Sequence, residues 1–343
     1  MTPLYTLYPS WISPEIIPGL PFRWYGMMYL VAFGITYLLF QRQVRREKLG
    51  WSEDEVSNFF LAAILGLILG ARLFGTFLYE PTGLYWRKPW LVIWPFDEAG
   101  RFVGFQGMSF HGGLVGVVIG TVIYARRRAL DYWEWADRMA VSVPLGYTFG
   151  RLGNFINGEL WGKVTSGPLG MVFPHAERFP TSEAWVREVA GKAGMALDTA
   201  RINLPRHPSQ LYEAFFEGIV LWLVLWFLVR PRRPYKGFAV GAYLIGYGAI
   251  RFAIEYLREP DSGLGYIIKL GDPDAPIHTF TTLWNFSMGQ ILCFLMIAGG
   301  AGFLAWRKSA SVREAAAAQS ARSGAGDPGR RKKEARKLRK KLG

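Results

Sequence analysis

Residues 150–162 read Gly150-Arg151-Leu152-Gly153-Asn154-Phe155-Ile156-Asn157-Gly158-Glu159-Leu160-Trp161-Gly162. This polar stretch closes an apolar segment, Met139–Phe149, that is typical of a membrane-embedded helix. Inside hydrocarbon, every charged side chain and backbone amide needs a partner within the protein or in a water-filled cavity. An arginine there costs about 2.5–3.5 kcal/mol on insertion scales, so it normally faces inward and marks a site. The sequence therefore predicts that this stretch faces the protein interior and carries the chemistry.

The rest of the chain supplies further apolar blocks. Of its 343 residues, 51% are hydrophobic, and they gather in blocks near the length of about 20 residues that spans a bilayer. Seven blocks can be marked: Phe22–Phe40, Phe59–Tyr79, Phe105–Tyr124, Met139–Phe149 with its polar extension, Leu211–Val229, Phe238–Leu257 and Leu283–Trp306. The sequence predicts an all-α integral membrane protein with seven transmembrane helices in one domain, residues 1–308.

Basic clusters set the expected orientation. One cluster follows each odd-numbered block: Arg42, Arg45, Arg46 and Lys48; Arg126, Arg127 and Arg128; Arg230, Arg232, Arg233 and Lys236; Arg307 and Lys308. The positive-inside rule then places the N-terminus outside and the C-terminus in the cytoplasm. On this topology the polar stretch lies near the outer face, and residues 163–210 form a small periplasmic subdomain.

The net charge of +14 does not by itself indicate nucleic acid, because the basic residues lie beside apolar blocks or in the tail. Such clusters orient membrane proteins or contact anionic lipid. The tail, residues 309–343, ends in a run of like charges, which predicts a basic, disordered cytoplasmic segment. The single cysteine, Cys293, excludes a disulfide framework and a cysteine-based metal site. The first 20 residues lack the basic start of a cleavable signal peptide.

Four ordered motifs carry a resemblance to a known family: Arg23-Trp24-Tyr25-Gly26, His111-Gly112-Gly113, the stretch 150–162, and His207-Pro208-Ser209-Gln210-Leu211-Tyr212-Glu213. Together they resemble the prolipoprotein diacylglyceryl transferases, over residues 23 to 259. The resemblance implies transfer of diacylglyceryl from phosphatidylglycerol to the lipobox cysteine of a prolipoprotein. It also implies a multi-pass protein of the bacterial inner membrane with its site toward the periplasm. Phosphatidylglycerol, a prolipoprotein signal peptide and membrane lipids are the expected partners, and no nucleic acid, cofactor or metal is expected.

Two arginines are the first candidates for holding a lipid phosphate, because a guanidinium stays charged and binds phosphate oxygens through a planar fork. Arg151 belongs to the polar stretch, and the resemblance assigns it phospholipid binding; the alternative is an interfacial arginine that reaches the headgroups. Tyr247, Arg251 and Glu255 recur every four residues, so they share one helical face. The alternative for Arg251 is an internal pair with Glu255 that only stabilises packing.

His111 is the third catalytic candidate and the only histidine within an expected span. A neutral imidazole can accept the proton of the attacking thiol. Whether His111 is this base or only orients the substrate stays open. The resemblance adds a set of substrate-binding or site-supporting residues: Tyr25, Asn154, Glu159, Gly162, His207, Gln210, Tyr212 and Glu213. Tyr247 and Glu255 join them because they share the helical face of Arg251. Glu159 has the alternative role of orienting an arginine.

Three other functions fit the sequence less well. In a transporter, the polar groups would gather near the midplane within inverted repeats, whereas here they gather at the outer end. A lipid-binding scaffold explains the arginines but not the histidine beside two glycines. An intramembrane serine protease would need a nucleophile motif, and no Gly-x-Ser-x-Gly is present.

Overall fold

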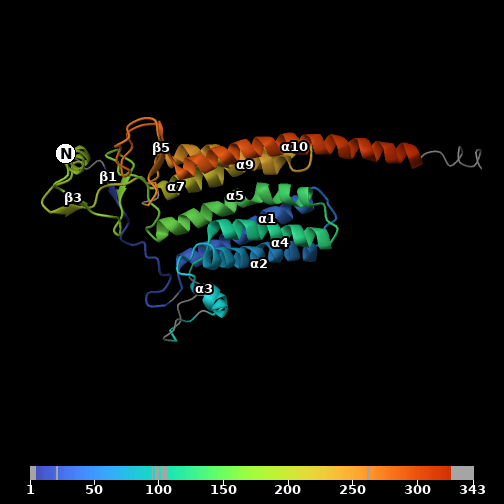
Figure 1. Cartoon of the computed structure of the whole chain (residues 1–343), viewed down its shortest axis with the longest axis horizontal. Helices are drawn as coiled ribbons and strands as arrows, with labels where there is room; N and C mark the ends of the chain where they lie inside the picture. The colour runs from blue at the N-terminus through green and yellow to red at the C-terminus, as the bar shows by residue number, and fades with distance from the viewer. Residues whose placement is uncertain are drawn as a thin grey trace, which may run out of the picture.

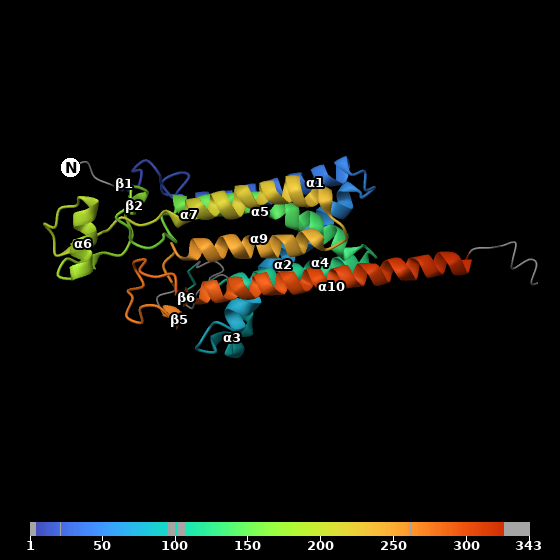
Figure 2. The same ribbon diagram turned by 90° about the horizontal axis from the view of Figure 1, so that it is seen from above.

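A computed structural model describes residues 5–20, 22–94, 96, 100–101, 107–260 and 263–325 of the chain. Within these residues, long helices run side by side (Figures 1 and 2): α1 Trp24–Arg46, α2 Glu53–Phe77, α4 Phe110–Arg127, α5 Tyr132–Ile156, the continuous helical segment Ser209–Arg232, α9 Phe238–Glu255 and α10 Met288–Ala325. Four of them are apolar and long enough to cross a membrane: Glu53–Phe77, Ser209–Arg232, Phe238–Glu255 and Met288–Ser320. A mostly helical membrane protein is therefore confirmed, whereas seven spans and their orientation stay predictions.

The helical segment Ser209–Arg232 is wound unevenly. It starts as α7, Ser209–Glu213, and then contains two π-helical stretches, η2 Ala214–Val220 and η3 Val224–Val229, separated by α8, Leu221–Leu223. A short 3-10 turn, η4 Arg230–Arg232, ends it. Because π-turns are rare and concentrate at functional sites, η2 indicates that this segment contributes to a functional site.

Glycines let two neighbouring helices approach closely. A Cβ at Gly70 of α2 would lie 2.2 Å from the carbonyl oxygen of Gly112 in α4, and one at Gly116 would lie 1.9 Å from that of Gly66. Only glycine leaves room for these contacts, as in other membrane helix pairs that pack through small residues. The α2–α4 pair is thus fixed by backbone contact.

Small strands and one helix gather at one end of the bundle (Figure 1). They form a parallel pair, β1 Tyr5–Leu7 with β2 Gly170–Val172, and two antiparallel pairs, β3 Phe179–Pro180 with β4 Arg201–Ile202 and β5 Tyr266–Lys269 with β6 Asn285–Ser287. Helix α6, Ala184–Ala193, buries Val186 and Ala190 against Phe179 and Leu204. Residues 163–210 therefore have an apolar core of their own. Two short helices, α3 Leu84–Arg87 and η1 Pro89–Val92, follow α2.

Several predicted boundaries are corrected. Helix α10 continues to Ala325, beyond residue 309, where the sequence predicts the start of a disordered tail. Alanines, which favour helix, occupy positions 315–318 and explain the continuation. The basic run 330–341 lies outside the described residues. Helix α5 includes the first half of the polar stretch, and α4 begins at Phe110, with residue 105 outside the described residues.

Candidate active site

The carboxylate of Glu213 lies among three guanidinium groups. Its side chain is 0% exposed; Oε2 is 3.0 Å from Nε of Arg151 and 2.9 Å from Nη1 of Arg251, and Oε1 is 2.5 Å from Nη1 of Arg258. Arg151 comes from α5, Arg251 from α9, and Arg258 from the turn after α9. One buried acid thus holds together cations from two helices and a loop.

Two further glutamates complete the group. Glu255 Oε2 is 3.1 Å from Nη2 of Arg251, and Glu217, on η2, is 3.7 Å from Nη1 of the same arginine. The hydroxyl of Tyr147 donates to Glu217 Oε2 at 2.6 Å and accepts from Nε of Arg151 at 2.6 Å. We call the six charged residues the arginine–glutamate cluster: Arg151, Arg251, Arg258, Glu213, Glu217 and Glu255. With all six ionised, their charges cancel.

The acids lie behind the arginines. The side chains of Glu213 and Glu217 are 0% exposed, whereas that of Arg151 is 19% exposed and that of Arg258 is 16% exposed. In the described part of the chain, Nη2 of Arg151 and Nη2 of Arg258 form no hydrogen bond or ion pair. The accessible side of the cluster therefore presents N–H donors, which suits an anion with several oxygen atoms.

The polar stretch braces Arg151. Nη1 of Arg151 donates to Asn154 Oδ1 at 3.2 Å, and Asn154 Nδ2 donates to Glu159 Oε1 at 2.9 Å. Glu159 therefore acts on Arg151 through Asn154, which is the orienting role considered as its alternative. Tyr25 lies alongside, since a Cβ at Gly153 would meet its ring at 3.4 Å, and its hydroxyl is 3.0 Å from that of Tyr29.

Gly162, His207 and Gln210 hold loop backbone in place. Gln210 Nε2 donates to the carbonyl of Glu159 at 2.6 Å, and the amide of Gly162 donates to the carbonyl of His207 at 2.8 Å. A Cβ at Gly162 would lie 2.3 Å from the carbonyl oxygen of Leu257, so no other residue fits. Burial, followed by the charge of Lys163, lowers the pKa of His207, whose Nδ1 is 3.3 Å from the Tyr212 hydroxyl. These contacts support the site; a direct role with substrate stays a prediction.

Arg251 and Glu255, four residues apart on α9, share one helical face, as the sequence predicts, and form an ion pair. The ring of Tyr247 lies at 89° to that of Tyr147, with centroids 6.0 Å apart, next to the cluster. His111 is elsewhere: it is exposed on the first turn of α4, and its Nδ1 is 3.3 Å from the hydroxyl of Tyr79. Within the described residues, its contacts do not reach the arginine–glutamate cluster.

Sequence reasoning missed Arg258, Glu217 and Tyr147. Two acids four residues apart, Glu213 and Glu217, within or at the edge of an apolar block are a signal that could have identified the acidic side of the cluster. Tyr147 likewise precedes Arg151 by one helical turn. Arg258 follows the end of its helix, where an arginine more often contacts headgroups, so its sequence position gave no such signal.

One group of metal-type ligands lies outside the cluster. Carboxylate and imidazole atoms of Glu177, Glu259 and His278 come within 4.8 Å of one another. However, Nη1 of Arg206 and Nδ1 of His278 both bond to Glu259. Burial opposes ionisation of Glu259, but these two partners lower its pKa. The carboxylate already has two partners, and the charge of Arg206 disfavours a metal ion there.

The chain is similar to known proteins over most of its length. The family model described as "Prolipoprotein diacylglyceryl transferase" matches residues 13–306. A phosphatidylglycerol–prolipoprotein diacylglyceryl transferase of Treponema denticola is 53% identical over 84% of this chain and 90% of the relative. Proteins of the same name are 50% identical in Treponema pallidum, over 90% of this chain and 98% of the relative, and 43% identical in Chlorobaculum tepidum, over 88% and 91%. The chain therefore belongs to the prolipoprotein diacylglyceryl transferase family.

Proposed function

We propose that this protein transfers diacylglyceryl from phosphatidylglycerol to the cysteine thiol of a prolipoprotein lipobox. The product is a thioether, and glycerol phosphate is released, as the first step of lipoprotein maturation. The names of the relatives support this reaction. The observation that carries it here is the set of guanidinium groups around Glu213, because Nη2 of Arg151 and Nη2 of Arg258 are left for a ligand.

In this reaction the thiolate sulfur attacks the diacylglycerol carbon that bears the phosphate. The carbon–oxygen bond breaks, and its electron pair leaves with glycerol phosphate. Arg151, Arg251 and Arg258 together hold the phosphate, with Nη2 of Arg151 and Nη2 of Arg258 as the donors left for it, and they offset the charge that grows on the leaving group. The carboxylates fix the directions of these guanidinium groups before the substrate arrives, so little reorganisation is needed during the reaction.

A thiol with an unperturbed pKa near 8.5 is only a few per cent ionised at neutral pH, so its proton needs an acceptor. We propose His111 for this role, since it is exposed on α4 and a neutral imidazole can accept a proton. Tyr25, Tyr247, His207 and Gln210 line or support the substrate path, and no cofactor or metal takes part.

We also propose seven membrane-spanning helices, in which α1, α4 and α5 join the four apolar spans. The N-terminus and residues 163–210 face the periplasm, and the C-terminal tail faces the cytoplasm. The basic residues at the opposite end of the helices support this orientation. The cluster then lies near the outer face of the bacterial inner membrane, where phosphatidylglycerol enters laterally from the bilayer.

The experiment uses purified protein, phosphatidylglycerol and two lipobox peptides, one with its cysteine and one with serine in its place. The peptide mass shift and release of glycerol phosphate are followed for wild type, Arg151→Ala and the control Arg127→Ala, which alters an exposed arginine at the other end of the bundle. We expect thiol-dependent transfer that collapses only in Arg151→Ala. Absence of transfer by folded wild type would contradict the proposed reaction, and full activity of Arg151→Ala would contradict the proposed phosphate site.

A further inference from the structure

Arginines also converge at the end of the bundle opposite the arginine–glutamate cluster. Helix α1 starts beside the cluster and ends with Arg46, and η4 begins with Arg230 at the far end of the segment that starts at Ser209. At 1.5 Å per residue, the 23 residues of α1 extend about 33 Å. The two ends of the bundle are thus separated by about the thickness of a bilayer core.

The charge around Arg230 is unbalanced. The charged groups that act on it are Glu47, Arg46, Arg233 and Arg42. Glu47 is already engaged, since its Oε2 is 2.5 Å from Arg138 Nη2 and 3.6 Å from Arg233 Nη2. Among the described residues, Arg42, Arg46 and Arg230 take part in no ion pair. Arg42, Arg46 and Arg230 are therefore three neighbouring positive charges, and no carboxylate among the described residues pairs with them.

Arg230 is held in position but lacks a partner for one donor. Its guanidinium carbon lies 4.3 Å from the centroid of the Trp226 ring. Its Nη1 atom is buried and forms no hydrogen bond with the described part of the chain. Because a buried donor without an acceptor is destabilising, an oxygen atom supplied by a ligand would be favoured here.

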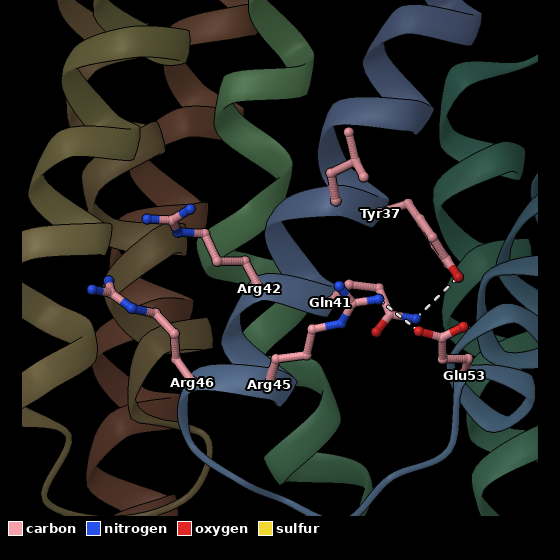
Figure 3. Close-up of a pocket in the computed structure, with 7 residues that line it drawn as sticks. Tyr37, Gln41, Arg42, Arg45, Arg46 and Glu53 are labelled. Atoms are coloured by element: carbon pink, nitrogen blue, oxygen red, sulfur yellow. Dashed lines mark hydrogen bonds and ion pairs between the residues drawn. The ribbon is translucent and has the colours of Figure 1, made fainter.

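The other two arginines, Arg42 and Arg46, lie near the C-terminal end of α1. Figure 3 shows Arg42 and Arg46 extending from α1 toward the neighbouring helices, while Arg45 points the other way, to Glu53, at 2.6 Å. A pocket of about 520 Å³ lies against this end of α1. It is lined by Tyr37, Leu38, Gln41, Arg42, Arg45, Arg46 and Glu53.

Exposed apolar side chains lie next to the arginines on the membrane side. Leu38, 65% exposed, precedes Arg42 by one helical turn, and Phe227, 57% exposed, precedes Arg230 by nearly one turn. A headgroup bound by the arginines would therefore have its hydrocarbon chains beside apolar surface. This combination of positive charge and apolar surface is complementary to a lipid and not to a soluble anion.

We propose that Arg42, Arg46 and Arg230 bind the phosphate of an anionic phospholipid in the leaflet opposite the active site. We call these three residues the basic site. Its lipid bridges α1 to the segment Ser209–Arg232 and supplies an acceptor for Nη1 of Arg230. The basic site is separate from the transferase chemistry, and its lipid is bound without being consumed.

The test uses full-length protein in detergent micelles, photoreactive phosphatidylglycerol as the probe, and mapping of the labelled peptides. Labelled peptides that contain residues 36–46 or 224–232 report the basic site, and those that contain Arg151 report the active site. Wild type is compared with Arg230→Gln and Arg42→Gln. The matched control is Arg45→Gln, which alters the arginine of α1 that is paired with Glu53.

We expect Arg230→Gln and Arg42→Gln each to reduce labelling of the basic site by about tenfold, the effect of losing one charge-assisted contact. Labelling of the active site should persist in both variants, which shows that they are folded, and Arg45→Gln should match wild type. Unlabelled phosphatidylglycerol should compete, and phosphatidylcholine should not. Unchanged labelling in both variants, or equal competition by phosphatidylcholine, would overturn the proposal. Displacement by inorganic phosphate at the concentration at which phosphatidylglycerol competes would instead identify a site for the free anion.

Discussion

At the scale of single residues, Glu213 determines the geometry of the active site. It is the common partner of Arg151, Arg251 and Arg258, and its side chain is fully buried. A buried carboxylate and its arginines contribute little net stability compared with an apolar packing, but loss of one partner leaves charge uncompensated. Glu213 therefore keeps three cations at short distances from one carboxylate.

The substitution Glu213→Gln preserves the shape of the side chain but removes its charge. We expect a loss of about 3–5 kcal/mol in the free energy of unfolding, because the cluster then carries one positive charge that Glu217 and Glu255 do not compensate. We also expect Glu213→Gln to reduce transfer activity, because the directions of the guanidinium groups are then no longer fixed. Chemical unfolding and the peptide assay measure the two effects. The control is Glu188→Gln, since Glu188 is exposed and paired with an exposed Lys192; equal damage in both variants would show that the cluster has no special role.

His111→Gln tests the proposed acceptor of the thiol proton. If His111 is that base, the rate at neutral pH falls by about 10²–10⁴-fold. The deficit then shrinks above pH ~9, where most of the peptide thiol is already ionised. The measurement is a pH–rate profile for both proteins with the same peptide. A deficit of constant size at every pH would assign His111 to positioning of the substrate.

Lys163 gives stability a pH dependence. Its side chain is buried, its Nζ donates to the carbonyl of Tyr256 at 2.9 Å, and burial lowers its pKa from 10.5 to about 8. Between these values the unfolded chain binds more protons than the folded one, so the free energy of unfolding rises with pH. Relative to Lys163→Met, wild type should gain about 3 kcal/mol as pH rises from 7.5 to 10.5. Lys192→Met, at an exposed position, should show no such change relative to wild type in the same unfolding series.

At the scale of elements, helices meet through backbone contact where glycines allow it. The contact of α2 with α4 depends on Gly66, Gly70, Gly112 and Gly116. The segment Ser209–Arg232 also approaches α5 closely at a glycine, but there the neighbour is a side chain: a Cβ at Gly218 would lie 2.0 Å from Oγ1 of Thr148. This second contact follows Glu213 by about one turn, so it fixes how deep the carboxylate enters the bundle.

Gly70→Ala tests the contact between α2 and α4. The added methyl group would lie 2.2 Å from the carbonyl oxygen of Gly112, so the helices must separate. We expect a loss of about 1–3 kcal/mol, the usual cost of overpacking. Gly34→Ala is the matched control: it lies within α1 with no atom within 4 Å of the added Cβ, and should leave the protein unchanged or slightly more stable. Thermal unfolding in one detergent compares the two, and equal effects would contradict the close contact.

At the scale of the whole molecule, hydropathy located the helices because an apolar block is a local property. Each long helix overlaps one predicted block, and the four-residue spacing correctly predicted that Arg251 and Glu255 share one helical face. Their ion pair matches the alternative given for Arg251. The partners of Arg151 were not predictable in this way, because Glu213 is 62 positions away in sequence. The short strand pairs also escaped prediction, since β1 pairs with β2 across more than 160 residues and has only three residues to reveal it.

The orientation in the membrane is a prediction about the whole molecule. In a variant with Cys293→Ala, Ser182→Cys on the strand-bearing end and Lys48→Cys on the opposite end are each exposed. A membrane-impermeant maleimide applied to spheroplasts should label Ser182→Cys but not Lys48→Cys. Lysis should make both reactive. The reverse pattern would place the arginine–glutamate cluster toward the cytoplasm.

The distribution of the cluster over the chain has a consequence for biogenesis. Arg151 lies on α5, Glu213 and Glu217 on the next long helix, and Arg251 on the one after that. With seven spans, as proposed, each of these helices alone would bring uncompensated charge into lipid, at about 2.5–3.5 kcal/mol per group. During synthesis Glu213 and Glu217 emerge after Arg151 and before Arg251. The charge of each helix is therefore neutralised when the next helix in the chain packs against it. The charges of the arginine–glutamate cluster thus make these three segments dependent on one another while the ribosome is still adding the C-terminal helix.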